Sequence, residues 1–112
     1  MQSSTKPLKI KNNGLKRIYK EYFSYKKETQ LDEAKLDKLK AEGKDSYVIA
    51  QQEKVIVESK AMIHDTGSRF RVWYDEVAEM VGSIKDELTM ASEDYKEAKK
   101  SLDDMAPLRK EI

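Results

Sequence analysis

A stretch of unbroken heptad spacing from Ile49 to Ile84 constrains the fold of this chain more than any other feature. Apolar and small polar residues recur across it at alternating steps of three and four. The residues at these positions are Ile49, Gln52, Ile56, Ser59, Ile63, Thr66, Phe70, Trp73, Val77, Met80 and Ile84. This spacing is typical of a helix in a left-handed coiled coil, in which one apolar stripe faces partner helices. The segments on either side of the stretch are therefore expected to be its partners.

The first of these partners is a helix predicted over about residues 7–42. Its stripe has the same spacing and consists of Leu8, Leu15, Ile18, Tyr22, Tyr25, Thr29, Asp32, Leu36 and Leu39. Pro7 suits the first turn, because its missing N–H would have no partner there. Gly14 costs about 1 kcal/mol relative to alanine inside a helix. We therefore expect the turns before Leu15 to be the least stable part of this helix.

The short segment 42–46 predicts a tight turn between the first and second helices. Gly43 can adopt the left-handed conformation that ends a helix, and Asp45 or Ser46 can cap the helix that follows. A connection this short predicts an antiparallel hairpin.

The hairpin brings particular residues of the two stripes together. We expect Trp73 to be a core anchor between the two helices, as large aromatic side chains often are. Thr29 falls opposite Ser59 in a polar layer, with Asp32 near Ile56. A buried polar layer of this kind is expected to fix the register of the helices at some cost in stability.

The second helix is predicted over about residues 46–88 and a short third helix over about 92–106. The residues from His64 to Ser68 are poor helix formers. Because the stripe passes through them in phase, we expect a kink there rather than a loop. Ser92 can cap the third helix, and Pro107 is expected to end it.

Together the three segments predict an all-α fold, an elongated antiparallel three-helix bundle with left-handed coiled-coil packing. We expect it to form a single domain over residues 1–112. Charged residues make up 38% of the chain, against four glycines and two prolines. This balance is typical of long solvated helices, and we do not expect a chain of this size to enclose a large active-site cavity.

The apolar residues beside the stripe change flank halfway along the second helix. Tyr74 and Val81 widen the stripe on one flank, where the third helix is expected to pack. Val48, Val55 and Met62 widen it on the opposite flank, in the half that a short third helix would leave uncovered.

An uncovered apolar strip at helical spacing predicts a partner-binding surface. The candidate partner-binding residues are Tyr47, Val48, Val55, Met62 and Phe23, the last of which lies off the stripe of the first helix. The alternative is that the first helix alone buries the two valines and Met62, because bundles also use flanking positions as core.

Charge is distributed unevenly along the chain. Residues 1–30 have eight Lys or Arg and two Glu, a net charge of +6, whereas residues 31–112 have fourteen basic and nineteen acidic residues, a net charge of −5. The antiparallel hairpin places the basic start beside acidic residues of the second helix, so internal attraction explains the asymmetry without an anionic partner.

Residue types that support catalysis or metal binding are scarce. The chain has no cysteine and one histidine, His64, which has no second histidine or thiol to share a metal with. Adjacent carboxylates such as Asp75 and Glu76 splay about 100° apart on a helix and cannot share a proton. With no phosphate-binding loop or nucleophile motif, we expect no enzymatic activity, no metal and no cofactor.

The sequence also gives expectations about nucleic acid and membranes. Basic residues at 16–27 alternate with Tyr19, Tyr22, Phe23 and Tyr25, a mixture that could bind nucleic acid by phosphate contacts and stacking. Two of these tyrosines belong to the stripe, however, and the net charge of the chain is only +1. For these reasons we do not expect nucleic acid to be a partner. We do not expect a membrane either, because no apolar run is long enough to span a bilayer.

Short motifs occur along the chain in an order that resembles a known family. They are Leu8–Ile18, Tyr25–Glu28, Lys38–Glu42, Tyr47, Gln51–Glu53, Glu58–Lys60, Met62–Ile63, Asp94–Ala98 and Leu102–Asp103. In this order, with one short turn, they are similar to the tubulin-binding cofactor A family. That family usually has proline at the position of His64, where it bends the second helix; here Gly67 could take over the bend. The segment before the third helix is about two residues longer than expected of the family.

The resemblance implies a chaperone that captures and holds β-tubulin after its release from the chaperonin, without nucleotide. It further implies a cytoplasmic, cytoskeleton-associated protein, with other tubulin-folding cofactors as further candidate partners. A monomer and a homodimer are both compatible with it. From the residues alone, the alternative is a structural coiled-coil or spectrin-like adaptor, followed by a nucleic-acid-binding helical protein.

Overall fold

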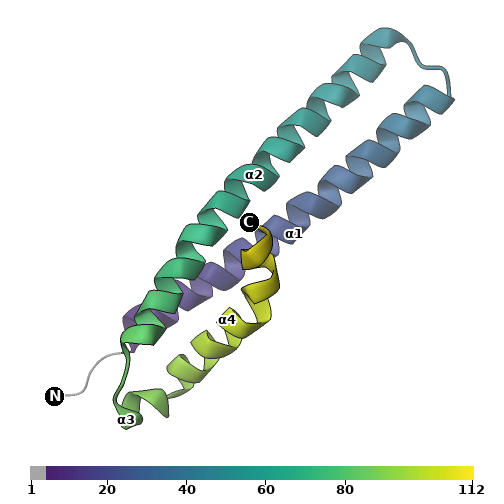
Figure 1. Cartoon of the computed structure of the whole chain (residues 1–112). Coiled ribbons are helices and arrows are strands. Elements are labelled where there is room, and N and C mark those ends of the chain that lie inside the picture. Colours follow the sequence, from purple (N-terminus) through teal and green to yellow (C-terminus); the bar gives the residue numbers. More distant parts are fainter. Residues whose placement is uncertain (1–4) are drawn as a thin grey trace. The chain divides into compact units, whose positions relative to one another are not determined.

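The computed structural model describes residues 5–112, which form four α-helices and no strand (Figure 1). The helices are α1 (Lys6–Ala41), α2 (Ser46–Ser83), α3 (Glu87–Met90) and α4 (Glu93–Glu111). The predicted all-α class is confirmed for this part of the chain.

The described residues group into two compact units. Unit 1 contains the chain up to Lys20 together with Gly67–Ile112, and unit 2 contains Glu21–Thr66. Both α1 and α2 pass without a break from one unit into the other, so residues 64–68 are helical and form no loop. The single domain over residues 1–112 stays a prediction.

Unit 2 consists of an antiparallel pair of helices closed by the predicted turn. Gly43 has φ of 69°, and the N–H groups of Gly43 and Lys44 donate to the carbonyls of Lys40 and Leu39. This pattern is a Schellman motif, which satisfies the last carbonyls of α1. The Asp45 carboxylate then accepts a 2.9 Å hydrogen bond from the Val48 N–H and caps α2, as predicted.

The predicted polar layer is present in unit 2, but its hydrogen bonds join other residues than the predicted pair. Ser59 donates to the Asp32 carboxylate at 2.9 Å, and the Gln52 side chain donates to the Asp32 main-chain carbonyl at 2.8 Å. Thr29 is buried, and its hydroxyl has no partner among the described residues. Asp32 is therefore the centre of the layer, rather than the expected pair of Thr29 and Ser59.

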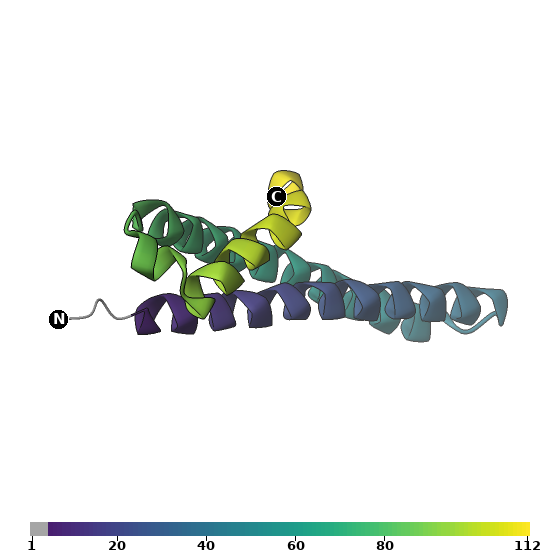
Figure 2. The same ribbon diagram turned by 90° about the horizontal axis from the view of Figure 1, so that it is seen from below.

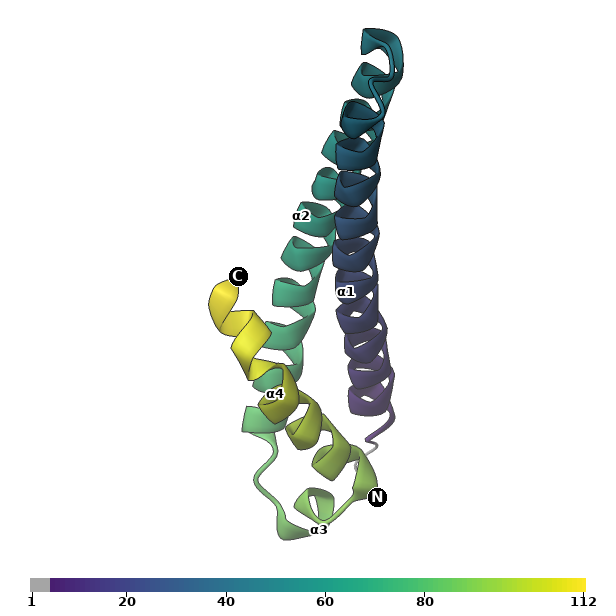
Figure 3. The same cartoon turned by 90° about the vertical axis from the view of Figure 1, so that its right-hand side faces the viewer.

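Unit 1 is a three-helix arrangement in which α4 packs on residues 6–20 of α1 and 67–83 of α2 (Figures 2 and 3). Its buried apolar residues are Leu8, Leu15, Ile18, Phe70, Val77, Val81, Ala98, Met105 and Leu108. The Tyr74 hydroxyl donates to the Leu102 carbonyl at 3.0 Å. The third long helix therefore packs on the flank marked by Tyr74 and Val81, as predicted.

The predicted proximity of the basic start of the chain to acidic residues of α2 is seen in one ion pair of unit 1. Lys11 is paired with Glu76 at 2.5 Å. Asp75, in contrast, pairs with Arg109 of α4 through two hydrogen bonds of 2.9 and 3.0 Å. Charges on α1 and α4 therefore both hold α2 in this unit.

Trp73 contacts α1 as predicted but is half-buried rather than a fully buried core residue. Its indole lies against Gly14, and the Lys11 ammonium lies 4.3 Å from the ring centroid. Gly14 is buried inside a continuous α1, so the helix is not interrupted there.

The predicted end of the second helix, at about residue 88, is wrong, because α2 ends at Ser83. Gly82 and Ser83 are weak helix formers, and the Ser83 hydroxyl donates to the Met80 carbonyl at 2.8 Å. Asp86 then caps the separate helix α3 by accepting from the Thr89 N–H. The extra residues noticed before the third helix form this short element.

The predicted end of the third helix, at Pro107, is also wrong, because α4 continues to Glu111. A proline inside a helix removes one backbone hydrogen bond and costs about 3 kcal/mol or more. Two residues beyond it are held in place by unit 1: Leu108 is 4% exposed, and Arg109 pairs with Asp75. These tertiary contacts stabilise the last turn in spite of the proline.

Candidate partner-binding groove

Three of the five predicted partner-binding residues line one groove of unit 2, which we call the turn-end groove. It has a volume of about 390 Å³ and is lined by Lys35, Leu39, Tyr47, Val48, Gln51, Gln52 and Val55. The first two residues come from the end of α1 and the others from the start of α2. The turn and the antiparallel register bring these two segments together.

The apolar side chains of the groove are accessible. Tyr47 is 70% exposed and Val55 is 40% exposed, while Val48 is half-buried. Met62 lies one heptad beyond Val55 on the same face of α2 and is 42% exposed, although it does not line the groove. The alternative in which the first helix buries these residues is therefore wrong for Val55 and Met62.

Phe23 is not brought together with the other four residues. It is 43% exposed, and its ring packs edge-on against Tyr22 with the centroids 5.3 Å apart. It lies about 120° around α1 from Lys35, which lines the groove. Phe23 therefore belongs to a different face of unit 2.

Four lining residues were not predicted from the sequence: Lys35, Leu39, Gln51 and Gln52. Leu39 and Gln52 were assigned to the two stripes, and Lys35 lies on the flank of α1 next to Leu36. Lys35 is charged, so the apolar flank pattern does not mark it; the signal that could have found it is the antiparallel register, which brings the end of α1 beside the start of α2.

The chemistry of the turn-end groove is that of a binding surface. Lys35 is the only charged residue that lines it, and the Gln52 amide is already bonded to the Asp32 carbonyl. Besides Lys35, Tyr47 is the one titratable side chain among the lining residues, and none of them is a carboxylate or a histidine. The groove can accept apolar side chains, with a carboxylate near Lys35.

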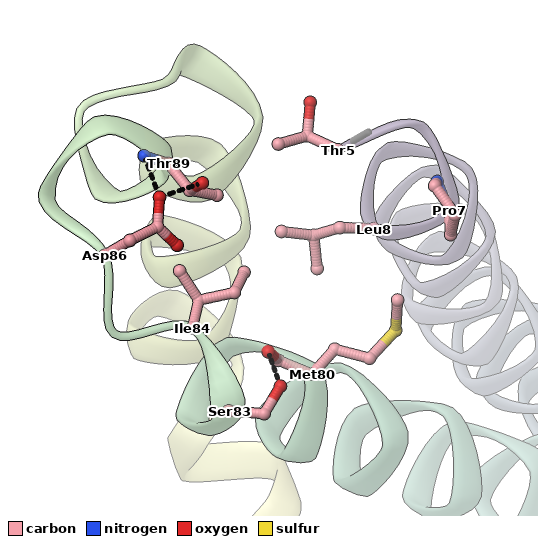
Figure 4. A pocket seen from close by; sticks show the side chains of 8 residues that line it. All are labelled: Thr5, Pro7, Leu8, Met80, Ser83, Ile84, Asp86 and Thr89. Carbon is pink, nitrogen blue, oxygen red and sulfur yellow. Dashed lines mark hydrogen bonds between the residues drawn. The ribbon is translucent and has the colours of Figure 1, made fainter. Parts of the chain in front are cut away.

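A smaller pocket in unit 1 lies between the start of α1 and the α2–α3 connection (Figure 4). It has a volume of about 260 Å³ and is lined by Thr5, Pro7, Leu8, Met80, Ser83, Ile84, Asp86 and Thr89. The Leu8 side chain points across it towards α3, as Figure 4 shows.

The polar groups of this smaller pocket have structural roles. Hydrogen bonds from the Thr89 hydroxyl and N–H lower the pKa of Asp86, which caps α3 as a carboxylate. The Ser83 hydroxyl donates to a main-chain carbonyl. The pocket therefore lacks a polar group available for chemistry.

The aromatic residues considered for nucleic-acid stacking are largely used in packing. Tyr22 is 8% exposed, and Tyr19 is half-buried with its ring 5.8 Å from that of Phe70. Side chains packed in this way cannot offer their faces to bases.

Two other classes of site are absent from residues 5–112. These residues contain no group of three or more His, Cys, Asp or Glu side chains that could hold a metal ion, and His64 is exposed. Among the four helices, none combines the length and apolarity needed to cross a membrane.

Comparisons with known proteins give a consistent result. A family model described as tubulin binding cofactor A matches residues 3–102. A tubulin-specific chaperone A of Rattus norvegicus is 38% identical over 96 residues, which are 86% of this chain and 87% of the relative.

Solved structures agree with this match. The crystal structure of tubulin folding cofactor A from Arabidopsis thaliana aligns with a TM-score of 0.80 and 32% identity, covering 91% of this chain and 94% of that one. The human tubulin chaperone cofactor A aligns with a TM-score of 0.77 and 30% identity, covering 91% and 97% of the two chains.

Proposed function

This chain belongs to the tubulin binding cofactor A family, and we propose that it captures and holds β-tubulin after release from the chaperonin, without nucleotide. The observation that carries the proposal is the uncovered apolar strip of unit 2, formed by Tyr47, Val48, Val55 and Met62. We assign β-tubulin binding to this strip and the turn-end groove.

The composition of the strip suits a client that is not fully folded. Methionine and valine offer apolar contact without demanding one fixed shape, and methionine adapts to irregular partners. Tyr47 adds a large exposed ring, a residue type enriched in protein interfaces. Lys35 at the groove adds a positive charge for an acidic residue of the client.

The absence of a third helix in unit 2 supports the assignment. In unit 1, α4 covers the flank that contains Tyr74 and Val81. Unit 2 contains residues of α1 and α2 only, so its apolar strip has no covering helix within the unit. A groove between two helices is a common receptor for a third.

The proposal also covers the setting in which the protein works. A chaperone that receives β-tubulin would act in the cytoplasm and associate with the cytoskeleton, and other tubulin-folding cofactors would be its neighbours in the pathway. The adaptor alternative predicts no preference for tubulin, and family membership weighs against it.

The test is binding of purified β-tubulin to the variant with Val55→Lys and Met62→Lys. We expect at least about tenfold weaker binding, because two ammonium groups would face the apolar client. Circular dichroism should show an unchanged helical signal, since both residues are about 40% exposed. If the folded variant bound β-tubulin as tightly as the wild type, the assignment of β-tubulin binding to this strip would be wrong.

A matched control is available on the same helix. Val57 is 67% exposed and does not line the groove. Val57→Lys should bind β-tubulin like the wild type. Addition of ATP or GTP should leave the affinity unchanged, and α-tubulin should bind more weakly; an obligatory nucleotide would contradict the proposal.

A further inference from the structure

We infer that unit 1 has a second docking surface, which takes an acidic amphipathic helix of a partner protein. We call it the tryptophan patch and define it by Ile10, Arg17, Arg69, Val72 and Trp73. The inference does not depend on the proposed binding of β-tubulin, because the patch belongs to the other unit.

The patch is built by the close packing of Gly14 on the Trp73 indole. On α1, Ile10 and Arg17 lie one turn before and one turn after this glycine, on the same face. On α2, Arg69 precedes Trp73 by about one turn and Val72 adjoins it. The contact between Gly14 and Trp73 therefore brings the residues of the patch onto one side of unit 1.

The apolar part of the patch is accessible. Ile10 is 60% exposed, Val72 is 49% exposed and Trp73 is half-buried. The interactions of α4 with α1 and α2 involve Lys16 and Tyr74, which lie on other faces of the two helices, and Asp75, which lies about one turn from Val72 at the edge of the patch. Tryptophan and arginine are the residues most enriched among those that dominate binding energy at interfaces.

The charges around Trp73 indicate an acidic partner. Lys11 beside the indole is already paired with Glu76. Arg17 and Arg69, at one end of the patch, are exposed and make no ion pair or hydrogen bond with the described residues. An incoming carboxylate would therefore meet two guanidinium groups without displacing an existing partner.

Beyond Glu76, the other end of the patch has an exposed acidic residue, Glu79. The charge of the patch therefore changes sign along its length. A partner helix that places its carboxylates at one end only would match this pattern, with those carboxylates at Arg17 and Arg69.

One observation favours a helix of another protein over a second copy of this chain. The opposite flank of the same helix pair already receives α4, so the geometry of this unit suits a third helix (Figure 3). A symmetric dimer with antiparallel copies would place Arg17 and Arg69 of one copy beside Glu79 of the other, so sedimentation of the free chain has to test for it.

The first experiment selects helical peptides of about 18 residues, a length of about 27 Å. A displayed library is selected on the full chain and depleted on the Ile10→Ser, Val72→Ser variant, whose changes are at exposed positions. We expect the surviving peptides to share an apolar stripe with Asp or Glu clustered at one end. Basic or non-helical survivors, or equal binding to the depletion variant, would overturn the inference.

The second experiment titrates the selected peptide, made without tryptophan, into the full chain. Trp73 is the only tryptophan, so its emission reports directly on the patch. We expect a saturable blue shift of the Trp73 emission, with an affinity that falls as the salt concentration rises. The affinity should be at least about tenfold lower in the Arg17→Glu, Arg69→Glu variant. The control, Lys27→Glu with Lys54→Glu, has the same net charge at exposed positions of unit 2 and should bind like the wild type.

Sedimentation of the free chain tests the remaining occupant. A monomer whose peptide binding depends on Arg17 and Arg69 supports the inference. A dimer that the Ile10→Ser, Val72→Ser variant dissociates would overturn it and assign the patch to self-association.

Discussion

Gly14 and Trp73 fit together so closely in unit 1 that no β-carbon can be accommodated between them. A β-carbon built on Gly14 would overlap Cζ3 of the indole and lie 3.0 Å from Cε3 and Cη2. The indole is thereby held against the α1 backbone. This contact explains why a glycine occurs inside a helix of 36 residues.

Gly14→Ala is predicted to destabilise the protein. Alanine gains about 1 kcal/mol in helix propensity. Overpacking costs about 1–3 kcal/mol, and here the β-carbon meets a rigid ring that must shift. We expect a net loss of up to about 2 kcal/mol in the free energy of unfolding, measured by urea titration with circular dichroism.

Gly82→Ala is the matched control. Gly82 is exposed in the last turn of α2, and a β-carbon there would meet nothing within 4 Å. This variant should be as stable as the wild type or more stable by up to about 1 kcal/mol. A Gly14→Ala variant that behaved like Gly82→Ala would show that Trp73 does not depend on the glycine.

Helix propensity alone led to the opposite interpretation of Gly14, as a weak point of the first helix. Helix propensity is a property of the residue, whereas the need for glycine here arises from a partner on another helix. The heptad pattern correctly indicated that Trp73 faces the first helix. It did not predict that the indole would remain half-exposed, because the depth of packing depends on the neighbouring side chains.

The polar layer leads to a second prediction, in which two hydroxyls behave differently. Ser59→Ala removes the donor to the Asp32 carboxylate and should cost about 0.5–1.5 kcal/mol of stability. Thr29→Val removes a buried hydroxyl that has no partner among the described residues, so it should be neutral or stabilising. The two unfolding midpoints measure the difference. Equal destabilisation by both changes would mean that Thr29 also has a partner in the folded state.

The helix boundaries were predicted less well than the helices themselves. The turn at Gly43 and the cap at Asp45 follow local rules and are confirmed. Pro107 is an equally strong local signal, yet α4 continues through it because Leu108 and Arg109 are anchored in unit 1. Tertiary contacts of this kind leave no periodic signal in the sequence.

The candidate groove could be predicted where it depended on heptad spacing. Tyr47, Val48 and Val55 were identified because an apolar flank at helical spacing is visible along one helix. Phe23 was included only because it lies off the stripe of its own helix, a property that does not specify which face of the pair it joins. The position of a residue across two helices requires the register between them.

The pairing of Arg109 with Asp75 predicts a dependence of stability on acid. Hydrogen bonds from Arg109 lower the pKa of Asp75 below its ordinary value of 3.8. The stabilisation is fully present above that value and is lost as the pH falls through the lower pKa of the folded state. Arg109→Gln should therefore reduce stability at neutral pH and lose less stability than the wild type on acidification below about pH 4. The effect should be modest, because both side chains are partly exposed to solvent.

Thermal unfolding of the two proteins from pH 7 to about pH 2.5 measures this difference. The control is Lys100→Gln, which removes the exposed pair with Asp104 within α4 and leaves the contact with α2 intact. Parallel pH profiles of wild type and Arg109→Gln would show that the pairing with Asp75 does not contribute to folding.

The hydroxyl of Tyr74 leads to the last prediction, at the alkaline end. Burial, followed by the nearby Asp103 carboxylate, raises the pKa of Tyr74 above 10.0, and its neutral O–H donates to the Leu102 carbonyl. The neutral form is favoured in the folded state, so this stabilisation is present below pH 10 and is lost as the pH rises through the raised pKa. Tyr74→Phe should lower the free energy of unfolding by about 0.5–1.5 kcal/mol at neutral pH. The variant should also lack the part of the alkaline loss of stability that comes from ionisation of Tyr74. The other five tyrosines are the same in both proteins, so the difference between the urea-unfolding free energies of the two proteins from pH 8 to about pH 11.5 isolates Tyr74. If that difference were constant over the whole range, the Tyr74 hydroxyl would not be linked to folding.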